Sequence, residues 1–211
     1  MNKRCLIISG GEECPLPADL REMDCVIACD KGYLYAGRMG LKPDLIVGDF
    51  DSAPMPETAI LVERLPSRKD DTDTMIAARH AAEMGCSEAV ILCCFGGRLD
   101  HTLANLQTGA WLAERGITAR LIGGDTEAAV FSGGTIRFPR REGWSLSLFA
   151  LSDRCEGVTI RGTKYDGEGL TLTNAFPLGV SNVWTSEVAE ITVSSGILLV
   201  MQSLLKEGEH I

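Results

Sequence analysis

Short runs of consecutive apolar residues, each followed by a helical pattern, most constrain how the first part of this chain can fold. Runs such as CVIAC and VILCC lack the alternation of a half-exposed strand. Continuously apolar strands are typical of a parallel sheet that is covered on both faces. Their alternation with helices predicts an open, mostly parallel α/β sheet with right-handed crossovers. We expect strands at 5–10, 25–30, 45–50, 90–95 and 119–124, and helices at 17–23, 31–39, 71–84 and 100–115.

The pattern changes after about residue 125. No long helical stretch follows, and short strand-like runs are separated by Gly, Asn, Asp and Ser, as in an all-β sandwich. The runs are TIRF, WSLSLFAL, GVTIRG, GLTLT, AEITV and GILLVMQ. We therefore predict an α/β domain at 1–125 and a β-sandwich domain at 126–211.

Charge and length exclude some classes of function. The 211 residues carry a formal net charge of −9 and no run of Lys or Arg. A nucleic-acid-binding protein needs a basic face, so nucleic acid is not the expected partner. A nucleotide remains possible, because Mg²⁺ can bridge carboxylates to phosphates. No apolar run reaches the length of a signal peptide or a membrane span, and we expect a cytoplasmic protein that does not bind membranes.

The eight cysteines show no paired metal-ligand spacing, and most lie inside apolar stretches. We interpret them as small buried side chains of a protein in a reducing compartment.

Two acids follow the strand LIV directly, in the segment 48–52. In an extended backbone, Asp49 and Asp51 would project to one side, with Phe50 facing the core. Two neighbouring carboxylates repel each other unless a cation or proton lies between them, and carboxylate oxygens suit Mg²⁺. The alternative is a polar turn.

Three further acids open the helix predicted near residue 71. Asp70 is a natural N-cap, and acids in a first turn suit the helix dipole. The three acids in Asp70-Asp71-Thr72-Asp73 exceed what capping needs, which favours a metal-assisted phosphate site. Lys69 can reach a phosphate as a point charge.

Paired glycines and an arginine follow the strand VILCCF. Gly96 and Gly97 permit close approach of backbone N–H groups to phosphate, and Arg98 suits bidentate phosphate binding. Asn105, further along the next helix, adds a polar group. His101 is better explained as a helix-start residue than as a base.

Asp30 follows the second strand, where it either caps a helix or contacts substrate or metal. No dinucleotide fingerprint and no phosphate-binding P-loop are present. A nicotinamide-dependent dehydrogenase and a P-loop kinase are therefore not supported. From chemistry alone, the pattern indicates an acidic, metal-dependent nucleotide site at the strand ends of an α/β domain.

Taken together and in this order, these segments resemble the thiamine pyrophosphokinase family. The matching segments are Asp30-x-Gly32, 43–52, Lys69-Asp70-x-Thr72-Asp73, Gly96-Gly97-Arg98-x-Asp100-His101 with Asn105, Gly162-Thr163-Lys164-Tyr165, Ser181-Asn182 and 196–200. The resemblance covers nearly the whole chain. Two positions depart from it: Lys31 stands where many members have Gly, and Val200 where some place a Trp against thiamine.

The resemblance implies an α/β domain that binds ATP and Mg²⁺, a β-sandwich that binds thiamine, and a homodimer with shared sites. It implies that Mg²⁺ is held by Asp49, Asp51 and Asp73. It implies ATP contacts from Asp30, Lys69, Thr72, Gly96, Gly97, Arg98 and Asn105. It implies thiamine contacts from Ser181 and Asn182.

In the implied reaction the thiamine hydroxyl attacks the β-phosphorus of ATP, and AMP leaves. Such transfer depends on positioning and charge neutralisation. We expect Asp70, Asp73, Arg98 and Asp100 to act in catalysis, with Asp100 or Asp70 accepting the hydroxyl proton. The alternatives are a non-catalytic thiamine- or nucleotide-binding regulator and a diphosphokinase for another small alcohol.

Overall fold

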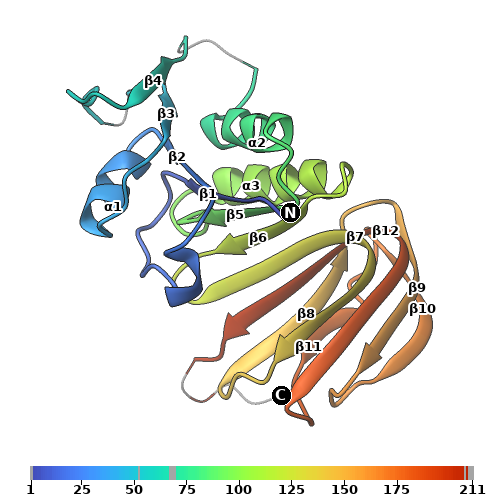
Figure 1. Ribbon diagram of the computed structural model, residues 1–211. Helices are drawn as coiled ribbons and strands as arrows, with labels where there is room; N and C mark the ends of the chain where they lie inside the picture. The colour runs from blue at the N-terminus through green and yellow to red at the C-terminus, as the bar shows by residue number, and fades with distance from the viewer. Residues whose placement is uncertain (1, 52, 67–69, 207, 209–211) are drawn as a thin grey trace. The chain divides into compact units, whose positions relative to one another are not determined.

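A parallel sheet forms the core of the first of two units, Met1–Gly124 and Asp125–Ile211. The computed structural model describes residues 2–51, 53–66, 70–206 and 208. The strands of the first unit are β1 (Arg4–Ile8), β2 (Cys25–Cys29), β3 (Leu45–Gly48), β4 (Leu61–Arg64), β5 (Glu88–Leu92) and β6 (Thr118–Ile122), drawn from blue to green in Figure 1. The prediction of a parallel α/β sheet is confirmed.

The order of strands locates the place where a ligand is expected. Neighbouring strands run β6-β5-β1-β2-β3-β4, and every pair is parallel. The chain builds outward from β1 to β4 and then returns to the other side of β1 to form β5. Sheets of this type bind ligands outside the carboxyl ends of the strands, where the order reverses. That point lies between β1 and β5.

Helices cover both faces of this sheet. They are α1 (Gly32–Arg38), α2 (Asp73–Glu83) and α3 (Leu99–Ala113), with a 3₁₀ turn at Ala18–Leu20. On one face, Leu6 and Ile8 of β1 pack with Leu20 and with Tyr35 of α1. On the other, α2 packs beside α3 and against the central strands. Within the described residues, none of the helices is both long and apolar enough to cross a membrane.

Two predictions for this unit were wrong. The helix expected at 17–23 is only a 3₁₀ turn, which begins after Pro17 and buries only Leu20. Strand β4 was not predicted, because its sequence LVER is half-exposed at the sheet edge and lacks a continuous apolar run. A strand that buries little carries little hydrophobic signal.

The second unit consists of strands: β7 (Thr126–Pro139), β8 (Trp144–Ala150), β9 (Arg154–Arg161), β10 (Gly167–Thr173), β11 (Gly179–Asn182) and β12 (Val188–Leu204). Its pairs are antiparallel, and the two long strands β7 and β12 pair along most of their length (yellow-green and red in Figure 1). The first half of β12 also pairs with β9, and its second half with β8. Strand β12 therefore has β7 on one side and first β9, then β8, on the other. We predicted a β-sandwich, and the second unit is made of strands as that prediction requires.

Glycines lie where β12 changes its partner from β9 to β8. Gly134 in β7 and Gly196 in β12 have φ of 91° and 90°, beside a register shift between Val193 and Ile197. A Cβ at Gly196 would lie 2.2 Å from the carbonyl oxygen of Arg154, so only glycine fits. The runs AEITV and GILLVMQ, expected as separate strands, are two halves of β12.

The core of this unit contains Val200, which stands where some family members place a Trp, and Trp184, which is close in sequence to Ser181 and Asn182. Trp184 is buried and donates a hydrogen bond from Nε1 to the carbonyl oxygen of Phe138 at 2.9 Å. Val200 is fully buried as well. Neither side chain is available to stack on a ligand at the surface.

Candidate active site

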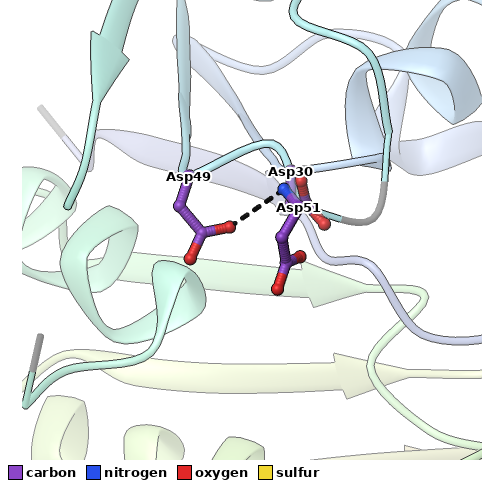
Figure 2. A group of neighbouring side chains, drawn as sticks. All are labelled: Asp30, Asp49 and Asp51. Atoms are coloured by element: carbon purple, nitrogen blue, oxygen red, sulfur yellow. Dashed lines mark hydrogen bonds between the residues drawn. The ribbon is translucent and has the colours of Figure 1, made fainter. Parts of the chain in front are cut away.

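Three carboxylates meet at the carboxyl ends of two neighbouring strands. Asp30 follows β2, and Asp49 and Asp51 follow β3 (Figure 2). One oxygen from each lies within 4.8 Å of the others. The carboxyl ends of the two strands lie side by side, because Cys29 pairs with Val47. Three charges this close repel one another, so the group favours a cation that takes hard oxygen ligands.

Left-handed backbone, rather than an extended strand, brings these acids together. Asp30 has φ of 46° and Phe50 of 59°. The N–H of Asp51 donates to Oδ1 of Asp49 at 3.2 Å, which closes a turn around Phe50. The prediction that this segment is extended was therefore wrong. A positive φ is costly for a bulky residue, and such strain often occurs at functional sites.

The start of α2 lies next to this group. Thr72 is the N-cap, and its Oγ1 accepts a hydrogen bond from the N–H of Met75 at 3.1 Å. The carbonyl oxygen of Asp73 accepts a weak hydrogen bond from the Cys29 thiol at 3.6 Å, which holds the helix start beside the end of β2. The interpretation of Asp70 as N-cap was wrong, because Thr72 already accepts from the free N–H of the first turn.

The structure changes which acids form the group. Asp30, and not Asp73, completes the set with Asp49 and Asp51. Asp71 lies apart, since its carboxylate accepts hydrogen bonds from Nε and Nη2 of Arg79 at 3.1 and 3.4 Å. Lys69 lies outside the described residues.

The glycine pair after β5 contacts a residue that the sequence analysis did not consider. Gly96 and Gly97 have φ of 82° and 67°. The N–H of Gly97 donates to Oε1 of Glu12 at 3.0 Å, and a Cβ on Gly96 would lie 2.4 Å from Cδ of Glu12. The carboxylate of Glu12 thus accepts a hydrogen bond from the N–H group of Gly97, which we predicted to bind phosphate. The signal for Glu12 was its place just after β1, at the point where strand order reverses.

Arg98 and Asp100 form an exposed ion pair. Nε of Arg98 donates to Oδ1 of Asp100 at 3.1 Å, and Nη2 donates to Oδ2. These hydrogen bonds lower the pKa of Asp100 and raise the pKa of Arg98. The N–H of His101 also donates to Asp100. While the pair is intact, the carboxylate of Asp100 is a weak base. The guanidinium group of Arg98 meanwhile donates its hydrogen bonds to Asp100.

Asn105 has a structural contact. It is buried in α3, and its Nδ2 donates to the carbonyl oxygen of Cys94 at 2.7 Å. This bond joins the helix to the segment that leads into Gly96, so Asn105 fixes the position of the glycine pair.

Ser181 and Asn182 belong to the second unit and differ in exposure. Ser181 is exposed, with φ of 60°. Asn182 is buried, and its side chain makes four hydrogen bonds of 2.9–3.0 Å: it accepts from the N–H groups of Tyr165 and Val183 and donates to Thr163 Oγ1 and the Tyr165 carbonyl. An amide side chain can make about four such bonds. The prediction that Asn182 binds a ligand directly therefore does not fit the structure.

Comparison with known proteins gives matches in both units. Two family models match: "Thiamin pyrophosphokinase, catalytic domain" at residues 19–121, and "Thiamin pyrophosphokinase, vitamin B1 binding domain" at residues 134–198. The chain is 27% identical over 208 residues to thiamine pyrophosphokinase of Bacillus subtilis (strain 168), over 93% of this chain and 97% of that protein.

Comparison with solved structures gives matches to the same family. The crystal structure of thiamine pyrophosphokinase from Bacillus subtilis matches with a TM-score of 0.83 and 26% identity, over 96% of this chain and 99% of that chain. A thiamin pyrophosphokinase family protein from Enterococcus faecalis matches with a TM-score of 0.79 and 26% identity, over 97% and 100%. One matched family segment lies in each unit of the present structure.

Proposed function

Because the chain belongs to the thiamin pyrophosphokinase family, we propose that it transfers the diphosphoryl group of ATP to the hydroxyl of thiamine and releases AMP. The observation that carries this proposal is the group of Asp30, Asp49 and Asp51 at the strand ends of the matched catalytic segment. Incubation with ATP, Mg²⁺ and thiamine should yield AMP and thiamine diphosphate in equal amounts. Binding of both substrates without turnover would instead identify a regulator.

We assign the predicted α/β domain, 1–125, to ATP and Mg²⁺, and the predicted β-sandwich domain, 126–211, to thiamine. The oxygens of Asp30, Asp49 and Asp51 suit Mg²⁺, which prefers carboxylate, water and phosphate ligands. When bound, the ion neutralises the charge that develops on the phosphates. Asp73, at the adjacent helix start, is proposed as a further acid of this site.

The segment after β5 would hold phosphate oxygens. The N–H groups of Gly96 and Gly97 and the fork of Arg98 are donors of the required kind. In the structure two of these donors contact carboxylates, Gly97 that of Glu12 and Arg98 that of Asp100. ATP would replace both carboxylates.

Other residues support this arrangement. Thr72 fixes the start of α2, and Asn105 fixes the glycine pair. Lys69 stays a proposed contact for ATP.

Two acids were candidates to accept the proton of the thiamine hydroxyl. Asp100 is held by Arg98, which lowers its pKa and its basicity. Asp70 is exposed at the approach to α2. We therefore favour Asp70, although transfer of this kind depends more on positioning than on a strong base.

Ser181 is proposed to bind thiamine, and Asn182 to hold the segment that surrounds it. Through Thr163 and Tyr165, Asn182 joins β11 to the turn after β9. Asp166 accepts hydrogen bonds from Gly162 and Thr163 in the same turn. Ser181 therefore lies next to a turn that several hydrogen bonds hold in place.

Replacing Arg98 by Lys should lower kcat/KM for ATP at least about tenfold, because the charge stays but the planar fork is lost. Steady-state kinetics at varied ATP concentration measure this effect. The matched control is Arg115→Lys, an exposed arginine beyond the other end of α3, which lies over the Trp111 ring. It should remain within about twofold of wild type. An equally small effect at Arg98 would remove its phosphate role.

We also propose a homodimer in which each site uses both chains, as the family resemblance implies. An Asp49→Asn chain and a Ser181→Ala/Asn182→Ala chain should each be inactive. After dissociation and reassociation, the mixed dimer would carry one site with both lesions and one with neither. Activity should return to about half that of wild type per mixed dimer. A monomer by sedimentation, or a mixture as inactive as its parents, would contradict shared sites.

A further inference from the structure

Two buried thiols face each other next to the candidate active site. The sulfur atoms of Cys14 and Cys93 are 3.6 Å apart. Cys93 follows β5 directly, and Cys14 lies in the irregular segment between β1 and the 3₁₀ turn. Both belong to the same apolar cluster of the first unit. The mechanism proposed above uses neither of them.

We propose that Cys14 and Cys93 form a reversible intramolecular disulfide when the protein meets a peroxide. An S–S bond is about 2.05 Å long, so the sulfur atoms need to approach by roughly 1.5 Å. Cys14 can supply this movement, because residues 13–17 belong to no helix or strand.

The backbone keeps this pair in place. The N–H of Ser9 donates to the carbonyl oxygen of Leu92, that of Gly11 to Cys93, and that of Glu12 to Phe95, at 2.9–3.2 Å. A Cβ on Gly11 would lie 2.4 Å from the Cys93 carbonyl oxygen, so the two segments are in close contact. The two cysteines are therefore close to each other because of the backbone, and not because of one side-chain rotamer.

The two thiols have different chemical roles. The hydrogen bond between the two thiols lowers the pKa of Cys14 to about 7. The same contact and burial raise the pKa of Cys93. A thiolate is the form that peroxides attack. Cys14 is also the less buried of the two, so we expect it to be the nucleophile and Cys93 to be the thiol that resolves the product.

The reaction balances with hydrogen peroxide as the two-electron oxidant. The Cys14 thiolate attacks one peroxide oxygen, which forms Cys14–SOH and releases hydroxide. The Cys93 sulfur then displaces the hydroxyl from the Cys14 sulfur and gives up its proton, so that one disulfide and two water molecules result in total. A dithiol reductant reverses the modification. The disulfide would tie the segment that carries Glu12 to the strand end that leads into Gly96.

The test treats reduced full-length protein with hydrogen peroxide, alkylates the remaining thiols and maps the linked peptides by mass spectrometry. Trypsin alone leaves Cys5 and Cys14 in one peptide, so a glutamate-specific protease is added, which cuts after Glu13 and Glu88. We expect loss of two of the eight thiols and one linked pair, 14–21 with 89–98, that dithiothreitol releases. Because peptide 89–98 contains both Cys93 and Cys94, fragmentation between these two residues shows that Cys93 is linked and Cys94 is alkylated.

Single Cys→Ser substitutions identify which sulfur atoms react. Cys93→Ser should leave Cys14 as a sulfenic acid that dimedone labels, and Cys14→Ser should lose both the label and the link. The matched control is Cys94→Ser, since Cys94 is buried beside Cys93 and donates to the carbonyl oxygen of Ile122 at 3.6 Å. It should keep the link.

The peptide map of the wild-type protein tests the proposal even if a variant does not fold. Eight intact thiols after treatment, or a link elsewhere, would overturn the proposal. The nearest competitors are Cys94 and the pair Cys5 and Cys25, which are in register on adjacent strands.

Discussion

Replacing Asp49 by Asn should lower kcat at least about 100-fold, on the scale of losing one positioned electrostatic contact. Asp49 shares its group with Asp30 and Asp51, and neutralising it removes one of three charges that would hold the metal. The amide keeps nearly the same shape, so the effect should come from charge. Calorimetric titration with Mg²⁺ should show weaker binding, and wild-type turnover should stop when a chelator removes divalent ions.

The matched control is Asp71→Asn in the neighbouring acidic segment. Its carboxylate pairs with Arg79 outside the group, at a partly exposed position, and such pairs contribute about 0–1 kcal/mol. Turnover should stay near that of wild type. If Asp49→Asn and Asp71→Asn behave alike, or if chelator-treated protein keeps its activity, the metal site is wrongly assigned.

Replacing Gly32 by Ala should destabilise the first unit by about 3 kcal/mol, at the upper end of overpacking effects. Gly32 is the first residue of α1, and a Cβ there would lie 2.2 Å from the carbonyl oxygen of Ile8 and 3.1 Å from that of Ser9. Both contacts are backbone, so no side chain can move aside. The helix or the end of β1 must shift, and Asp30, two residues before, should shift with them.

Gly37→Ala is the control in the same helix. No atom lies within 4 Å of a Cβ at Gly37, which is exposed, so alanine should stabilise the unit by about 0.5–1 kcal/mol. Chemical denaturation followed by far-UV circular dichroism reports on this unit, because the described α-helices all lie in it. Equal denaturation midpoints for the two variants would show that Gly32 has more room than the structure gives it.

Strands buried on both faces were predictable from their residues. β1, β2, β3, β5 and β6 lie within three residues of the expected ranges, because burial on both faces requires a continuous apolar run. Strand β4 at the sheet edge and the short β11 have no such requirement and were missed. Helix α2 begins at Asp73 and not at residue 71, because Thr72 competes successfully as the cap.

Local patterns were enough to predict that the first half is a parallel α/β sheet, that the second half is made of strands, and that acids and glycines cluster where strands end. Periodicity and turn chemistry are local, so a single sequence can show them. Which of these residues meet depends on the three-dimensional arrangement of the strands. Asp30 joins Asp49 and Asp51 because β2 and β3 are neighbours and because Asp30 and Phe50 adopt positive φ. Glu12 reaches Gly97, and Cys14 reaches Cys93, because β1 and β5 are adjacent in the sheet although far apart in the chain. Such distances depend on strand order and on backbone conformations that packing imposes against local preference, and no local pattern contains either.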